Sequence, residues 1–238
     1  MKKSWIAAAM LALASCSPEV VDWSKVPDEK IYADGVAEIR KENWAGAVQN
    51  LQNIGLAHPY SKYIGRAEIM MGYAQYRDGK HKEASTHFET FLKFQPSAPD
   101  VPYALYMHAM SQYGMMRPVQ REQKETANAL KLMEQLVREW PKTEYAEAVG
   151  PLIVRARNTL AGKEMHTAKE LARGRNIFAA LNRYQIVATR YANTAWAPEA
   201  LFRAAEIYDM AGEPGEAAKL RAQLSEKYPG NEWSGTNQ

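Results

Sequence analysis

The strongest constraint on the fold is a spacing of small and large residues that occurs five times along the chain. In each unit an alanine is followed by larger side chains four and seven positions later, and the residue at position seven is always apolar. In four of the five units a proline follows twelve positions after the alanine. The alanines are Ala47, Ala84, Ala129, Ala180 and Ala217. Positions zero, four and seven share one face of an α-helix, a small residue lets two helices approach closely, and a proline ends a helix. The pattern therefore predicts repeated helices that pack closely against a partner.

A second small residue marks that partner helix. It lies twelve positions before the alanine in four units, as Gly35, Gly72, Ala168 and Ala205. In the third unit it is assigned to Ala109, twenty positions before, so about eight residues are inserted there, around positions 114–124. This is the layout of tetratricopeptide repeats, whose usual length is about 34 residues. Since helical spacing continues from Glu29 onward and no alternating strand pattern occurs, the predicted fold is all-α: a right-handed tetratricopeptide-repeat superhelix of five helix pairs plus one connecting helix, about eleven helices in total.

These repeats divide the chain into an N-terminal array of three (residues 29–141) and a C-terminal array of two (residues 162–229). Between them, residues 142–161 form an amphipathic stretch that we interpret as a connecting helix, which Gly150 and Pro151 interrupt and can kink. Residues 230–238 are rich in Gly and Asn and are expected to be a disordered tail. The insertion in the third repeat is expected to be a loop or a helix extension.

The N-terminal residues have the organisation of a lipoprotein signal. Lys2 and Lys3 precede an apolar stretch, and the sequence Leu-Ala-Ser-Cys ends at Cys16, which is the only cysteine of the chain. In such signals residues 1–15 are removed, the cysteine sulfur receives diacylglycerol and the new amine is acylated. Two or more long acyl chains anchor a protein stably. Ser17 is typical of lipoproteins of the outer membrane, so the domain is expected on its periplasmic face. Residues 16–28 are expected to be the lipidated cysteine and a flexible tether, which spans about 40 Å at full extension.

Composition argues against several classes of function. The net charge is +3, and without Lys2 and Lys3 it falls to +1, which provides no basic surface for nucleic acid. One cysteine allows no internal disulfide and no cysteine zinc cluster. The five histidines (His58, His81, His87, His108 and His166) lack metal-ligand spacing, and no nucleophile elbow or phosphate loop occurs. No catalytic residue, no metal site and no cofactor other than the lipid on Cys16 is predicted.

The chain resembles a known family, the BamD (ComL or YfiO-type) lipoproteins of the β-barrel assembly machinery. The matching segments are residues 29–32, 43–48, 73–77, 99–107, 136–141 and 180–184. The resemblance implies a non-catalytic, lipid-anchored adaptor that helps to fold and insert outer-membrane β-barrel proteins. Its implied partners are unfolded barrel proteins, the barrel-shaped insertase and accessory assembly lipoproteins. A tetratricopeptide lipoprotein that serves a cell-division or wall-synthesis complex is an alternative, and a lipid-anchored hydrolase is a more remote one.

Two sets of candidate binding residues follow. The first helix of each tetratricopeptide pair lines the concave face, and its register predicts an aromatic wall with interspersed cations. This peptide-binding set is Tyr32, Arg40, Tyr63, Arg66, Tyr73, Tyr76, Arg77, Tyr103, Tyr106 and Tyr113. Barrel proteins typically end in an aromatic residue with a free carboxylate, which could stack on these rings while Arg77 binds the carboxylate. Several of these tyrosines could instead pack between helices. By resemblance, Asn182 and Arg183, at the start of the second helix of the fourth repeat, lie near the insertase interface.

Overall fold

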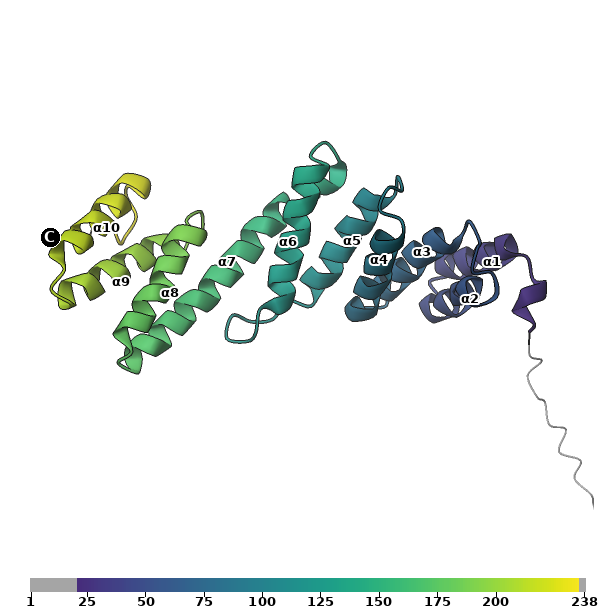
Figure 1. The fold of residues 1–238 in the computed structure, drawn as a ribbon, viewed down its shortest axis with the longest axis horizontal. Helices are drawn as coiled ribbons and strands as arrows, with labels where there is room; N and C mark the ends of the chain where they lie inside the picture. Colours follow the sequence, from purple (N-terminus) through teal and green to yellow (C-terminus); the bar gives the residue numbers. More distant parts are fainter. Residues whose placement is uncertain (1–20, 236–238) are drawn as a thin grey trace, which may run out of the picture.

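The protein is an array of helix pairs, as the computed structural model of residues 21–235 shows (Figure 1). This part of the chain contains ten α-helices, one short 3-10 helix (Trp23–Lys25) and no β-strand. The α-helices are α1 (Asp28–Arg40), α2 (Trp44–Ala57), α3 (Ile64–Arg77), α4 (His81–Phe94), α5 (Val101–Gly114), α6 (Lys124–Glu139), α7 (Glu144–Arg173), α8 (Ile177–Arg190), α9 (Ala197–Met210) and α10 (Pro214–Lys227). Each helix packs against the next one along the chain. The predicted all-α repeat fold is confirmed. None of these helices is long and apolar enough to cross a membrane.

The repeated alanines are the centres of the helix pairs. All five are fully buried, and the apolar side chains seven positions after them are buried as well. The large side chains four positions after Ala47 and Ala84 pack on Gly35 and Gly72, the small residues of the first helices. A Cβ atom on Gly35 would lie 2.5 Å from Cγ of Leu51, and one on Gly72 would lie 2.9 Å from Cζ of Phe88. The large side chain of one helix therefore occupies the space that the absent side chain of the other leaves open.

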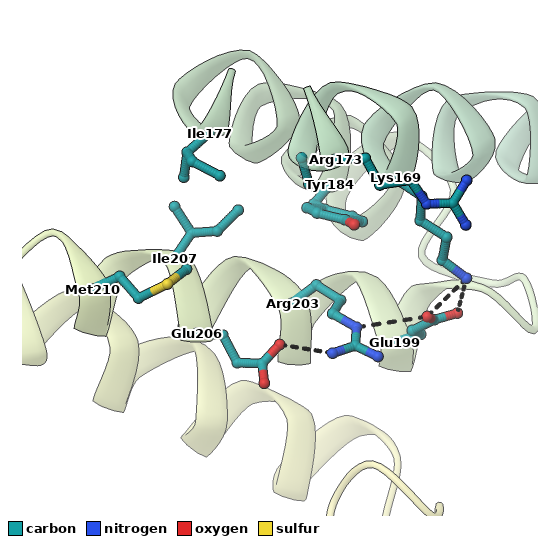
Figure 2. A pocket seen from close by; sticks show the side chains of 10 residues that line it. Lys169, Arg173, Ile177, Tyr184, Glu199, Arg203, Glu206, Ile207 and Met210 are labelled. Atoms are coloured by element: carbon teal, nitrogen blue, oxygen red, sulfur yellow. Dashed lines mark hydrogen bonds and ion pairs between the residues drawn. The ribbon is translucent and has the colours of Figure 1, made fainter. Parts of the chain in front are cut away.

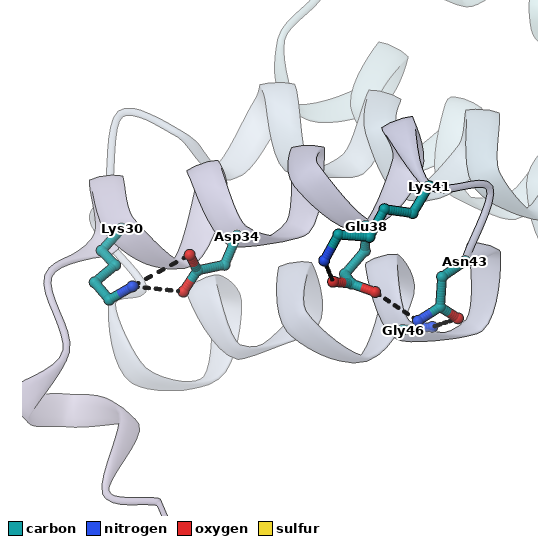
Figure 3. Close-up of polar contacts among 6 residues, drawn as sticks. All are labelled: Lys30, Asp34, Glu38, Lys41, Asn43 and Gly46. Atoms are coloured by element: carbon teal, nitrogen blue, oxygen red, sulfur yellow. Dashed lines mark hydrogen bonds and ion pairs between the residues drawn. The ribbon is translucent and has the colours of Figure 1, made fainter.

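The turn that joins α1 to α2 is held by side-chain hydrogen bonds and ends in a helix cap. In the turn between α1 and α2, Glu38 forms an ion pair with Lys41 at 2.8 Å and accepts a hydrogen bond from the side-chain amide of Asn43 (Figure 3). The carbonyl oxygen of that amide accepts a hydrogen bond from the Gly46 N–H and so caps α2. The hydrogen bond from Lys41 is the main reason that the pKa of Glu38 lies below its usual value.

Helix α7 corrects the predicted division between connecting helix and fourth repeat. The stretch 142–161 and the first helix of the fourth pair form one helix of 30 residues, so residues 21–235 contain ten α-helices where about eleven were expected. Pro151 lies inside this helix and removes one backbone hydrogen bond. The helix continues because its N-terminal half packs into the core of α5 and α6 through Val149, while its C-terminal half packs into the core of α8 and α9 through Met165. Burial on both sides offsets the cost of the proline.

The insertion in the third repeat is a compact loop at residues 115–123. The side-chain amide of Gln123 donates hydrogen bonds to the backbone carbonyls of Arg117, Pro118 and Arg121. Its carbonyl oxygen accepts a hydrogen bond from the Thr126 hydroxyl at 2.6 Å. One buried glutamine thus holds the whole loop together.

Both ends of the described chain are more ordered than expected. The predicted tether 16–28 is held from Asp22 onward, because Nε2–H of His58 donates to the carbonyl oxygens of Trp23 and Val26, at 3.2 and 2.8 Å. In the predicted tail 230–238, Trp233 lies 5.3 Å from the ring of Phe202 and packs on the C-terminal core. The tail prediction is therefore wrong for residues 230–235, because an indole buries a large apolar area. Residues 1–20, including Cys16, and residues 236–238 lie outside the described part.

The close approach inside the first pair leads to a stability prediction. Gly35→Ala places a Cβ atom against Leu51 and should lower the free energy of unfolding by about 1–3 kcal/mol, which is the usual cost of overpacking. Gly55→Ala in α2 is the matched control, because a Cβ atom there meets nothing within 4 Å. It should raise the stability by about 0.5–1 kcal/mol. Thermal unfolding followed by circular dichroism measures both changes, and equal melting temperatures for the two variants would contradict the packing described here.

Candidate functional site

The first helices of the first three pairs enclose a cavity on the inner surface of the array. Its volume is about 320 Å³, and it is lined by Tyr32 of α1, Arg66, Ile69 and Met70 of α3, and Asp100 and Tyr103 at the start of α5. Three members of the predicted peptide-binding set, Tyr32, Arg66 and Tyr103, therefore lie together. We call this space the inner cavity.

One lining ring of the inner cavity, Tyr32, stacks on the ring of Tyr63. The rings of Tyr32 and Tyr63 are 5.0 Å apart and nearly parallel, with an interplanar angle of 19°. Tyr63 precedes α3, where its N–H donates to the hydroxyl oxygen of Ser61, and that hydroxyl donates to Asp28 at 2.6 Å. The loop between the first two pairs is thus fastened to α1, which positions the ring of Tyr63 over Tyr32.

Arg66 is the cation of the inner cavity. Its side chain is exposed, and among residues 21–235 no hydrogen bond, ion pair or ring contact engages its guanidinium. Asp100 also lines the cavity and contributes the opposite charge at its margin. A free guanidinium beside aromatic rings can bind a carboxylate through two parallel hydrogen bonds.

Arg77 is placed differently from the prediction. Its guanidinium donates a hydrogen bond to the Tyr73 hydroxyl at 2.7 Å and lies 5.0 Å from the ring centre of Trp44. Glu42 is 3.7 Å away. Arg77 therefore already has partners within its own chain and does not line the inner cavity. Trp44 was missed by sequence reasoning because it belongs to α2, a second helix, whereas only first helices were searched for inner-surface residues.

Tyr103 and Tyr106 lie against a ring that the sequence did not single out. Tyr145, at the start of α7, is 5.8 Å from Tyr103 and 5.3 Å from Tyr106. Burial raises the pKa of Tyr103 to about 12, with smaller contributions from neighbouring Tyr73, Tyr145 and Tyr106. Tyr145 is the second residue of α7, so its place opposite α5 depends on how the start of α7 packs on the third pair.

The other members of the predicted set do not meet in one place. Tyr76 packs against His81 with ring centres 5.1 Å apart, and burial raises its pKa. The hydroxyl of Tyr113 is buried and has no hydrogen-bond partner in the described chain, so this ring packs between helices and is not a wall residue. Arg40 is exposed at the end of α1, outside the inner cavity.

A second cavity of about 420 Å³ lies between α7, α8 and α9 and was not predicted. At one end, Glu199 pairs with Lys169 at 2.9 Å and lies 3.7 Å from Arg203. At the other end are the apolar side chains Ile177, Ile207 and Met210 (Figure 2). Its charged groups neutralise one another, whereas the cation of the inner cavity is free.

Asn182 and Arg183 point to different sides of α8. They are the sixth and seventh residues of that helix, not its first, because α8 begins at Ile177. Asn182 lines an outer groove between α8, α9 and α10, whereas Arg183 forms an ion pair with Glu164 of α7 at 3.0 Å. Neighbouring residues of a helix are about 100° apart around its axis, so the two cannot bind one small contact surface together.

No group of three or more histidine, cysteine, aspartate or glutamate side chains within residues 21–235 is placed to hold a metal ion. What the inner surface offers is aromatic rings and a free cation.

Comparison with known proteins assigns the chain to a family. Residues 24–224 match the family YfiO, described as outer membrane lipoprotein. The outer membrane protein assembly factor BamD of Caulobacter vibrioides is 32% identical over 96% of this chain and 77% of its own length. BamD of Rickettsia prowazekii is 30% identical over 87% of this chain and 82% of its own length. BamD of Neisseria meningitidis serogroup A is 26% identical over 96% of this chain and 92% of its own length.

The partly buried phenol of Tyr103 allows a prediction for alkaline pH. Burial favours the neutral phenol and so raises its pKa in the folded state. The resulting contribution to the free energy of unfolding is complete below the ordinary pKa of 10.0 and is lost as the pH rises toward about 12. Tyr103→Phe should remove the last step of the tyrosinate absorbance titration and weaken the loss of stability in that range. Tyr60→Phe, which removes a phenol 99% exposed, is the control and should leave that last step in place. A last step that persists in Tyr103→Phe would contradict the assignment.

Proposed function

The chain belongs to the YfiO family of outer membrane lipoproteins, and on that premise we propose that it is an assembly factor for outer-membrane β-barrel proteins. In this role it is a non-catalytic adaptor, anchored by lipid on Cys16 at the periplasmic face. Three relatives that match most of the chain bear the name outer membrane protein assembly factor BamD. An array of helix pairs with an open inner surface suits the binding of extended segments of other proteins.

The inner cavity is proposed as the place where the C-terminal segment of an unfolded barrel protein binds. The main support for this proposal is the free guanidinium of Arg66 in a cavity that Tyr32 and Tyr103 also line. A chain end with an aromatic residue and a free carboxylate has the complementary chemistry. The ring would stack on the tyrosines, and the carboxylate would accept hydrogen bonds from Arg66.

Arg66 replaces Arg77 as the proposed carboxylate ligand. To bind a peptide, Arg77 would have to give up its hydrogen bond to Tyr73 and its position over Trp44. Arg66 gives up only water. In addition, the cavity around Arg66 is partly enclosed, so a charge-assisted hydrogen bond there is less screened than one on the open surface.

The two C-terminal pairs are proposed to dock on the insertase and a companion lipoprotein. Arg183 could contribute a charged donor, although its ion pair with Glu164 would have to open or be shared. Asn182 would serve a different contact, in the groove of α8, α9 and α10.

Peptide binding tests the role of the inner cavity. A labelled peptide that copies the C-terminus of a barrel protein should bind the purified protein more tightly as the free acid than as the amide. Arg66→Gln should weaken binding of the free acid about ten- to a hundredfold, as expected for the loss of a charge-assisted hydrogen bond, and remove the preference over the amide. Asp100→Asn should strengthen binding of the free acid, because it removes a carboxylate that repels the carboxylate of the peptide.

Arg40→Gln is the matched control for that experiment, since it removes an exposed cation at the end of α1, outside the cavity. It should keep the preference for the free acid. Fluorescence anisotropy measures all affinities. If the wild-type protein binds free acid, amide and scrambled peptide equally, the chain has no carboxylate site.

Membrane attachment is tested with Cys16→Ala. The variant cannot be acylated and should appear in the soluble periplasmic fraction with unchanged helicity, because the helix pairs pack without lipid. Each buried methylene of the acyl chains contributes roughly 0.8 kcal/mol to the free energy of membrane binding. The variant carries no acyl chain and loses this contribution entirely. Retention in the membrane fraction at high salt would show that Cys16 does not hold the protein there.

Charge reversal tests the docking role of the fourth pair. Arg183→Glu should reduce co-purification with the insertase several-fold, in the range expected for an interfacial charge. Glu164→Gln breaks the same intramolecular ion pair but keeps the arginine, so it should leave co-purification unchanged. An equal loss in both variants would mean that the ion pair matters for the fold and not for the interface.

A further inference from the structure

We propose that one edge of the N-terminal array rests on the surface of the lipid bilayer, with its apolar side chains among the headgroups. This edge is formed by the C-terminal ends of α2 and α4 and by the loop after α2. We call it the membrane-facing edge and define it by Leu56, Tyr60, Lys62, Lys93 and Phe94. The inference rests on the proposed lipid anchor at Cys16 and adds a second, direct contact of the fold with the membrane.

Large apolar side chains are exposed along this edge. Leu56 is 78% exposed, Tyr60 99% and Phe94 72%. The same helix, α4, buries Phe88 and Phe91 in the core. Phe94 follows at the helix end and points outward, so the apolar pattern continues beyond what the core requires. Exposed apolar groups that gather in one region mark an interaction surface.

The packing of the chain brings these residues to one edge. Both α2 and α4 are second helices of a pair, so they run in the same direction and end at the same side of the array. The Gln95 side chain, next to Phe94, lies so close to Gly65 that a Cβ atom there would be 2.2 Å from it. The end of α4 is therefore adjacent to the start of α3, which directly follows the loop that carries Tyr60 and Lys62.

Cations accompany the apolar groups. Nζ of Lys62 lies 5.0 Å from the ring centre of Tyr63, and Nζ of Lys93 lies 5.6 Å from that of Phe94. Neither ammonium group forms an ion pair among residues 21–235. Two neighbouring acidic groups are engaged. Asp22 pairs with Lys25, and Asp28 accepts a hydrogen bond from Ser61, which lowers its pKa together with a smaller contribution from the charge of Lys62. Aromatic rings with unpaired lysines are the combination that binds an anionic lipid surface.

The point where the chain enters the fold indicates a membrane as the partner. His58, between Leu56 and Tyr60, holds the backbone of Trp23 and Val26, so the N-terminal segment joins the fold at this edge. Asp22 follows Cys16 by only six positions, and such a segment spans at most about 20 Å. An acylated Cys16 therefore keeps Asp22, and the part of the edge around His58, near the bilayer surface.

The opposite edge supplies a matched control. The loops after α5 and α7 lie along the lower side of the array in Figure 1, and the loop between α6 and α7 lies along the upper side, so helix ends alternate between two edges. Phe178 at the start of α8 and Met210 at the end of α9 are 76% and 71% exposed. They belong to the other edge, at the far end of the array from α1 and α2 (Figure 1).

Fluorescence quenching in vesicles tests the proposal with the lipidated full chain. Cys16 is the only cysteine, and its sulfur is blocked by lipid, so one new cysteine is the single labelling site. Tyr60→Cys and Phe94→Cys carry an environment-sensitive fluorophore, and Phe178→Cys and Met210→Cys carry the same fluorophore as controls. The vesicles contain anionic lipid and a lipid with a nitroxide on its headgroup. We expect at least about twofold stronger quenching at positions 60 and 94 than at 178 and 210, and a reduction of this difference by Lys62→Glu with Lys93→Glu.

Equal quenching at all four positions would overturn the proposal and leave the apolar edge to a protein partner. Mass spectrometry of the same samples reports the lipid on Cys16, and an unmodified thiol would remove the premise. Peptide binding at Arg66 is measured separately, so a failed membrane contact is distinguishable from a failed substrate site.

Discussion

The structure depends on the close contact between a small residue of one helix and a large side chain of its partner. Gly35 meets Leu51 and Gly72 meets Phe88 at distances that exclude even a methyl group. This contact sets the depth at which each first helix lies against its second helix. Because the register is repeated, the remaining faces of the first helices align, and their tyrosines and arginines form one inner surface. The candidate site is thus a consequence of the packing that stabilises each pair.

Helix α7 connects the core of the third pair rigidly to that of the fourth. Its N-terminal half belongs to the core of the third pair and its C-terminal half to that of the fourth. A continuous helix has a fixed rise and rotation per residue, so the C-terminal pairs have a defined orientation relative to the inner cavity. Under the proposed function, substrate binding and insertase docking would take place on one stiff body. The inner cavity lies near the N-terminal ends of α3 and α5, close to the proposed membrane-facing edge, which suits delivery of a chain end to a membrane-embedded partner.

The candidate site was predicted in part. Tyr32 follows from register, because it lies three positions before Gly35 on the same helix face, and the sequence placed Arg66 beside this surface and Tyr103 at its edge. Register could not distinguish Arg66 from Arg77, since both are exposed cations on the same helix. That distinction depends on Trp44 and Tyr73, which engage only Arg77. Tyr113 was misplaced for a similar reason: whether a ring faces solvent or a neighbouring helix depends on the next pair.

The sequence by itself determined the helices, their pairing and the five buried alanines, because these follow from local periodicity and from the size of single residues. It also indicated the lipid signal at Cys16. Only the tertiary structure decided that residues 142–173 contain one helix, that the segment before α1 is held by His58, and that Trp233 closes the C-terminal core. These features depend on contacts between residues far apart in the chain. The energy of such contacts, here buried apolar area and hydrogen bonds to backbone carbonyls, outweighs the local preference of proline, tether and tail sequences for irregular structure.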